Sequence, residues 1–194
     1  MINKEDCLIL LEKHLGEEKR IIDHSKTVNK VALHIAWELN NAGIPIDIAL
    51  VDGGSLLHDI GKIREIKSSN SLSHAEEGYK ILMDEELEDF ANIVRKHLFY
   101  SFRNPMLRPR NWEEKILFYA DMLVKEGDAE GGKKYRLVPF TERLDYLRKV
   151  YGKNKEILEA IDESENLLYA IETQLIERIG DGYTKKLEEE VNLV

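Results

Sequence analysis

The chain has 194 residues, with 28 Lys or Arg against 37 Asp or Glu, which gives a formal net charge of −9 at pH 7. This length suits one domain with a substantial core, or one domain with an appended helical subdomain. The negative charge disfavours a long nucleic acid or an acidic membrane as partner, the single cysteine excludes an internal disulfide framework, and the apolar runs are too short to span a bilayer.

The first three predicted elements are helices at about residues 6–15, 22–41 and 48–60. Their apolar residues recur at helical spacing, and strand-like alternation is hard to find in the chain. Gly16 is expected to close the first helix and Asp47 to cap the third. The third helix is apolar enough to form the buried centre of a bundle. We therefore predict an all-α fold.

The middle of the chain is predicted to hold two further helices after a polar loop at residues 67–71. Ser73 is expected to cap the first of them, which begins at His74, and the second spans about residues 87–99. Residues 100–112 contain two prolines and three arginines, so we interpret this stretch as a basic loop.

A helix at about residues 113–126 precedes several glycines, which are expected to separate a core at residues 1–126 from a helical extension at residues 127–194. An apolar stripe at helical spacing marks a long helix in this extension: Leu158, Ile161, Leu168, Ile171, Leu175 and Ile179. Such a stripe packs either on the core of its own chain or at a homodimer interface, and periodicity alone does not decide between these arrangements.

The strongest chemical signal is His58 followed by Asp59, which end the apolar run of the third helix and precede Gly61 and Lys62. Neighbouring helical residues point about 100° apart, so both side chains meet one ion only if it lies beside their turn. Imidazole and carboxylate together suit divalent Fe, Mn, Co, Ni or Zn better than soft ions. The remaining ligands are then expected from other segments.

Four further residues beside apolar helical patterns complete a candidate ligand set. The full set in chain order is His24, His58, Asp59, His74, His97 and Asp121. Asp121 is embedded in so apolar a helix that its carboxylate needs a strong partner such as a metal ion. With this order the sequence resembles the HD superfamily of metal-dependent phosphohydrolases, in particular its HDIG-type members with six potential ligands. The resemblance runs from about Arg20 to Lys125 and implies an HD-domain helical bundle.

The resemblance also implies a hydrolase that uses two divalent ions, with a shared carboxylate, most plausibly Asp59, and water as the nucleophile. The expected catalytic residues are His58, Asp59 and Lys62. Lys62, Arg20 and Arg103 are the expected contacts to a substrate phosphate, because Arg20 shares a helix face with His24 and Arg103 belongs to the basic loop. The expected substrate is a small nucleotide-like phosphate ester or anhydride.

Two alternatives stay open at this point. One is a nucleotidase that uses a single ion bound by His24, His58, Asp59 and Asp121, with the other two histidines acting on substrate or leaving group. The other is a non-catalytic regulatory or nucleotide-binding module in which a metal only stabilises the fold. The amino terminus lacks a signal-peptide pattern, so the expected compartment is the cytoplasm.

Overall fold

A computed structural model of the protein describes residues 2–67, 72–129 and 132–191. Helices form nearly all of its regular structure, which confirms the predicted all-α class, and a single two-stranded hairpin is the β structure within these ranges. The polar loop predicted at residues 67–71 lies outside the described residues except for Lys67. No helix in the described part of the chain has the length and apolar character needed to cross a membrane.

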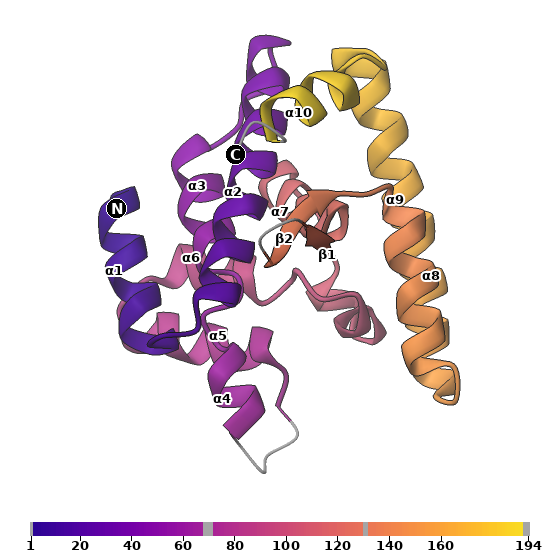
Figure 1. Ribbon diagram of the computed structural model, residues 1–194. Helices are drawn as coiled ribbons and strands as arrows, with labels where there is room; N and C mark the ends of the chain where they lie inside the picture. The colour runs from indigo at the N-terminus through magenta and orange to yellow at the C-terminus, as the bar shows by residue number, and fades with distance from the viewer. Residues whose placement is uncertain (1, 68–71, 130–131, 192–194) are drawn as a thin grey trace.

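The first three helices are α1 (Lys4–Leu15), α2 (Lys19–Asn41) and α3 (Ile48–Leu57). Asn3 and Asp6 cap α1 reciprocally, each side chain accepting a hydrogen bond from the other residue's backbone N–H. Helices α2 and α3 pack against each other in the centre of the molecule (Figure 1). Their contact surface is mainly apolar, and within it the buried amide of Asn29 donates to Oδ1 of Asp52 at 2.7 Å and to Oγ of Ser55 at 2.9 Å. This packing fixes the position of the two helices that lead to the candidate site.

Helix α3 ends three residues earlier than predicted, so His58 and Asp59 lie in a turn and not in the helix itself. An unpredicted short helix, α4 (Lys62–Lys67), follows this turn immediately. Helix α5 (His74–Asp84) begins where it was predicted, with the Ser73 hydroxyl accepting from the N–H of Glu76.

Helix α6 (Glu88–Val94) is also shorter than predicted, and His97 follows it in a turn. The predicted basic loop contains two short 3₁₀ segments, η1 (Phe99–Arg103) and η2 (Pro105–Leu107).

The predicted end of the helix at 113–126 is wrong. Helix α7 (Trp112–Leu123) ends at Leu123, and the chain continues directly into strand β1 (Val124–Ala129). Strand β2 (Gly132–Leu137) returns antiparallel, with Val124 opposite Leu137. The glycines therefore belong to a hairpin. Gly131 itself lies outside the described residues.

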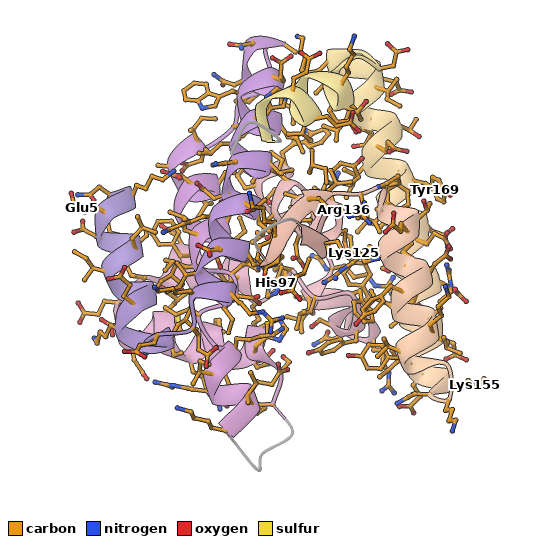
Figure 2. All side chains as sticks on the ribbon, viewed as in Figure 1. Glu5, His97, Lys125, Arg136, Lys155 and Tyr169 are labelled. Atoms are coloured by element: carbon orange, nitrogen blue, oxygen red, sulfur yellow. The ribbon has the colours of Figure 1, made fainter. Side chains whose placement is uncertain are left out.

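The extension contains α8 (Phe140–Tyr151), α9 (Lys155–Ile179) and α10 (Tyr183–Val191). Helices α8 and α9 lie side by side at one edge of the molecule, and α10 returns towards α2 (Figure 1). The middle of the apolar stripe, from Ile161 to Leu175, is buried within the single chain. Lys155 and Tyr169 lie on the outer side of this helix pair (Figure 2).

One continuous apolar core joins the two predicted parts of the chain. Buried side chains from α1, α2, α3, α5, α6 and α7 and from α8, α9 and α10 belong to the same cluster. The boundary predicted after residue 126 falls inside β1. The extension consequently packs directly beside the segments that carry the candidate ligands.

Candidate metal centre

All six predicted ligand side chains converge on one cluster, although they come from five separate segments. They are His24 of α2, His58 and Asp59 of the turn after α3, His74 at the start of α5, His97 of the turn after α6, and Asp121 of α7. The four imidazoles and Asp59 are buried, with exposed fractions between 1% and 8%. Tertiary packing has thus brought together residues up to 97 positions apart.

Asp59 lies between two groups of ligand atoms. Its Oδ2 is 4.0 Å from Nε2 of His24 and 3.8 Å from Nε2 of His58. Its Oδ1 is 3.1 Å from Nε2 of His74 and 3.9 Å from Nε2 of His97. The two oxygens of one carboxylate therefore face two different pairs of histidines.

Asp121 joins the first of these pairs. Its Oδ1 lies 2.9 Å from Nε2 of His24 and 3.7 Å from Nε2 of His58. One ligand atom from each of His24, His58 and Asp121 falls within 4.8 Å of the others, and the same holds for His58, Asp59 and His97. Such spacings are those of groups able to converge on a common cation.

Hydrogen bonds on the far side of three rings fix which nitrogen faces the cluster. Nδ1 of His58 donates to the carbonyl of Ser55 at 2.8 Å, and Nδ1 of His97 donates to the carbonyl of Val94 at 2.6 Å. Nδ1 of His74 lies 2.9 Å from Oε2 of Glu65. The carbonyl acceptors require the proton on Nδ1 of His58 and His97, so Nε2 of each ring presents a lone pair to the cluster.

The surroundings of Nε2 of His58 show whether a metal ion would fit the cluster. This atom is buried, and no hydrogen-bond donor reaches it among the described residues. A buried lone pair without a donor is costly unless a cation accepts it. The atom faces the carboxylates of Asp59 and Asp121, and such a set of nitrogen and carboxylate ligands matches the first-row divalent metals.

The electrostatics favour the metal-binding protonation states. Burial opposes ionisation of Asp59, but Lys62 and the surrounding imidazoles outweigh it and hold its pKa well below the usual range. Burial lowers the pKa of His58, and burial together with repulsion from neighbouring imidazoles lowers the pKa of His97 to about 3. Ionised carboxylates and neutral imidazoles are the forms that bind metals.

Gly61 explains how the turn holds two segments of the site together. A Cβ at this position would lie 2.2 Å from the carbonyl oxygen of His74 and 2.4 Å from the backbone nitrogen of Gly78. Only glycine therefore permits this approach of the turn to α5. The contact sets the position of His74 relative to Asp59.

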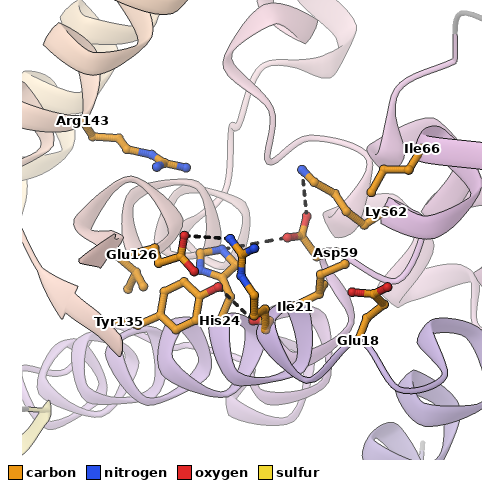
Figure 3. Close-up of a pocket in the computed structure, with 11 residues that line it drawn as sticks. Glu18, Ile21, His24, Asp59, Lys62, Ile66, Glu126, Tyr135 and Arg143 are labelled. Atoms are coloured by element: carbon orange, nitrogen blue, oxygen red, sulfur yellow. Dashed lines mark hydrogen bonds and ion pairs between the residues drawn. The ribbon is translucent and has the colours of Figure 1, made fainter. Parts of the chain in front are cut away.

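Two adjoining cavities open at the cluster. The smaller one, of about 170 Å³, is lined by ligand residues from both groups together with Lys62, Tyr151 of α8 and Arg143 of α8. The larger one, of about 330 Å³, shares Lys62 and Arg143 and extends past Tyr135 of β2 (Figure 3). Both cavities contact His24 and Asp59, so a molecule bound in either would reach the cluster.

The three predicted substrate contacts have different environments. Lys62 lines both cavities, with Nζ 3.9 Å from Oδ1 of Asp59. Arg20 lies at the rim of the larger cavity and pairs with Glu126 at 2.7 Å. Arg103 lines neither cavity and pairs instead with Glu156 of α9 at 2.8 Å, because η1 directs it towards the extension.

Sequence reasoning missed two residues that the structure places at the cavities, Tyr135 and Arg143. The ring of Tyr135 packs against His24 with centroids 5.1 Å apart. A signal for Arg143 did exist: Phe140, Leu144 and Leu147 define the apolar face of α8, and Arg143 lies on that same face. No local pattern revealed the hairpin that carries Tyr135.

This helical fold and its cluster of histidines and aspartates agree with a match between the HD domain family and residues 21–126. The chain belongs to the HD domain family. The matched range contains all six candidate ligands and ends before α8. HD domains generally bind divalent metals, and the cluster described above contains groups of histidine and aspartate side chains that could hold such an ion.

Among known proteins, the chain is similar to tRNA (cytidine(56)-2'-O)-methyltransferases of Picrophilus torridus, with 32% identity over 133 residues, and of Thermoplasma volcanium, with 34% identity over 132 residues. These matches cover 63% and 62% of this chain but only 36% of each methyltransferase. The chain thus spans about a third of the length of these relatives. An uncharacterized protein of Methanocaldococcus jannaschii is 28% identical over 84% of this chain and 98% of its own length. No solved structure matches significantly.

Proposed function

We propose that this protein is a metal-dependent phosphohydrolase that cleaves a phosphate ester or anhydride of a nucleotide-like substrate with a metal-activated water. The position of Asp59 carries the proposal, because its two oxygens face two separate pairs of histidines. This arrangement favours two ions with a shared carboxylate. The proposed ligands are His24, His58, Asp59, His74, His97 and Asp121.

The protein's own residues orient the ligands and the substrate. Divalent Fe, Mn, Co, Ni or Zn bound at the cluster would neutralise charge on a phosphate and lower the pKa of a bound water. Backbone carbonyls hold the rings of His58 and His97 in fixed orientations. Lys62 lines both cavities, which supports the proposal that its ammonium contacts a phosphate oxygen. No protein nucleophile is required.

The similarity to proteins named tRNA methyltransferases points to a different reaction, but it covers about a third of their length. The residues gathered at the cluster of this chain are candidate metal ligands, which supports hydrolysis. A tRNA nevertheless belongs in the substrate panel, because those relatives are named for acting on tRNA.

The test combines metal content with phosphate release. The purified protein would be analysed by mass spectrometry and assayed with Mn²⁺, Fe²⁺, Co²⁺ or Ni²⁺ on nucleoside phosphates, a cyclic nucleotide and a tRNA. Activity should fall by at least about a hundredfold in His58→Ala and Asp59→Ala, because each removes a ligand. His14→Ala is the matched control, since His14 lies on α1 and contacts Glu85 at the end of α5, away from the cluster.

The outcomes separate the proposal from its alternatives. Two ions per chain, with release lost in both variants, would support the dinuclear hydrolase. One ion per chain with activity would favour the nucleotidase that uses His24, His58, Asp59 and Asp121. Stoichiometric metal and nucleotide binding without any turnover would overturn the hydrolase and support a regulatory module.

A further inference from the structure

Arg143 is a cation that the helical extension places against the candidate metal centre. It belongs to α8, beyond the matched range of residues 21–126, and lines both cavities. Figure 3 shows the guanidinium of Arg143 and the ammonium of Lys62 on opposite sides of the larger cavity, with His24 and Asp59 below them in this view. The extension therefore contributes a charged side chain to a site whose candidate ligands all come from the HD domain.

The side chain of Arg143 has no carboxylate partner among the described residues, and its Nε is buried without a hydrogen-bond acceptor. Six of the nine other arginines of the chain pair with acidic side chains within 3.0 Å: Arg20, Arg95, Arg103, Arg108, Arg136 and Arg148. A partly buried guanidinium with an unused donor is costly unless an anion binds to it. Arg143 thus differs from the paired arginines in a way that points to a missing anionic partner.

We propose that Arg143 and Lys62 form a two-cation site that binds the phosphate of a phosphomonoester; this proposal rests on the phosphohydrolase function proposed above. A guanidinium can donate to two phosphate oxygens at once, whereas an ammonium acts as a point charge. A monoester dianion carries three non-bridging oxygens, enough to contact both cations and the metal centre. A diester carries one charge and two such oxygens, so it can make fewer contacts with the two cations and the metal centre.

The larger cavity gives the substrate's organic group a place beside the phosphate. Tyr135, Ile21 and Val124 supply an aromatic ring and apolar side chains to its lining. Its volume of about 330 Å³ lies at the lower end of the range for small-molecule sites. A single nucleoside or comparable group therefore suits it better than a long polymer.

Binding of inorganic phosphate tests the site without requiring turnover. Isothermal titration calorimetry would compare the Mn²⁺-loaded and metal-free forms of wild type, Arg143→Ala and Arg143→Lys. Arg143→Ala should weaken phosphate binding by about 10- to 100-fold in the loaded protein, and Arg143→Lys should recover part of this loss. Lys149→Ala is the matched control, because Lys149 is an exposed cation on the same helix and lines neither cavity.

Unchanged phosphate affinity in Arg143→Ala, or no phosphate binding by the wild type, would overturn the proposal. Thermal unfolding of each variant shows whether it is folded. If Arg143→Ala does not fold, Arg143→Lys decides the question, since loss of the two-oxygen contact should still weaken binding several-fold. Wild-type affinity in a folded Arg143→Lys would then count against the site.

Steady-state kinetics distinguish this inference from the phosphohydrolase function itself. Arg143→Ala should raise KM for p-nitrophenyl phosphate about tenfold or more, and should affect bis-p-nitrophenyl phosphate less. Inactive Asp59→Ala together with wild-type KM in Arg143→Ala would reject the two-cation site and keep the hydrolase. Phosphate binding that depends on Arg143 in a protein without turnover would reject the hydrolase and keep the anion site.

Discussion

Glu65 holds His74 through both its ring and its backbone. Its Oε2 lies 2.9 Å from Nδ1 of His74, and its Oε1 accepts from the backbone N–H of His74 at 3.0 Å. Burial would raise the pKa of Glu65, but these contacts with His74 outweigh it and lower the pKa to about 2. The carboxylate therefore stays ionised while the other nitrogen of the ring faces Asp59 at 3.1 Å.

Removing this support should weaken one metal position selectively. Glu65→Ala is expected to lower the affinity for the ion beside His74 by about 10- to 100-fold, because the partner behind a metal-binding imidazole sets its orientation and basicity. Manganese titration followed by electron paramagnetic resonance would resolve the two affinities. Glu76→Ala is the control, since Glu76 pairs with Arg95 at the opposite side of α5. The expected role would be contradicted if the affinity for each ion were the same in Glu65→Ala as in wild type.

Gly61 should tolerate a methyl group far less well than Gly78. An added Cβ at Gly61 would meet backbone atoms of α5 at 2.2 Å and 2.4 Å, whereas at Gly78 the nearest atom is a side-chain methyl of Val94 at 3.1 Å. Gly61→Ala is expected to lower the free energy of unfolding by about 3 kcal/mol or more, and Gly78→Ala by about 1 kcal/mol. Urea denaturation measures both, and similar losses would show that the turn can move away from α5.

The ligand set could be predicted from sequence because each ligand lies next to a strong local signal. His58 and Asp59 end an apolar helix, His74 follows a good capping serine, and Asp121 interrupts an apolar run. These signals are local, so one sequence suffices to find them. The order of the residues, compared with a known family, then predicted that they meet, and the distances now show that they do.

The remaining features of the site depend on packing between distant segments. Strands β1 and β2 carry lysines, glycines and an aspartate, which hide the alternation expected of a hairpin. Their placement depends on contacts such as the hydrogen bond from the Tyr135 hydroxyl to the carbonyl of Arg20 at 2.9 Å. Arg103 illustrates the opposite error: its basic neighbourhood suggested a phosphate contact, but its partner is an acidic residue of the extension.

The extension is tied to the HD domain by a buried pair of tyrosines. The hydroxyl of Tyr119 on α7 lies 2.9 Å from that of Tyr183 on α10 and 3.0 Å from Oε1 of Glu172 on α9. Tyr183→Phe should cost about 1 kcal/mol of unfolding free energy through the lost hydrogen bond, and Tyr183→Ala about 3–5 kcal/mol through the lost packing. Thermal and urea unfolding would measure these losses, with the half-exposed Tyr169→Phe as control. Equal, small losses in both Tyr183 variants would mean that α10 contributes little to the core.

Cys7 should make the protein less stable at alkaline pH. Its thiol on α1 is almost fully buried, and burial, reinforced by Asp52 and Asp6, raises its pKa from 9.0 to about 11. Between these two values the unfolded chain has released the thiol proton while the folded chain retains it. Stability therefore falls as the pH rises above about 9.

The measurement is urea unfolding of wild type and Cys7→Ala at pH 8 and pH 10.5. Other alkaline groups titrate in both proteins, so the difference between their pH dependences reports the thiol. Wild type should lose about 1–2 kcal/mol more than Cys7→Ala over this interval, because one pKa unit corresponds to about 1.4 kcal/mol. Parallel losses in the two proteins would show that the thiol ionises equally easily in the folded and unfolded chains, and hence that α1 opens readily to solvent.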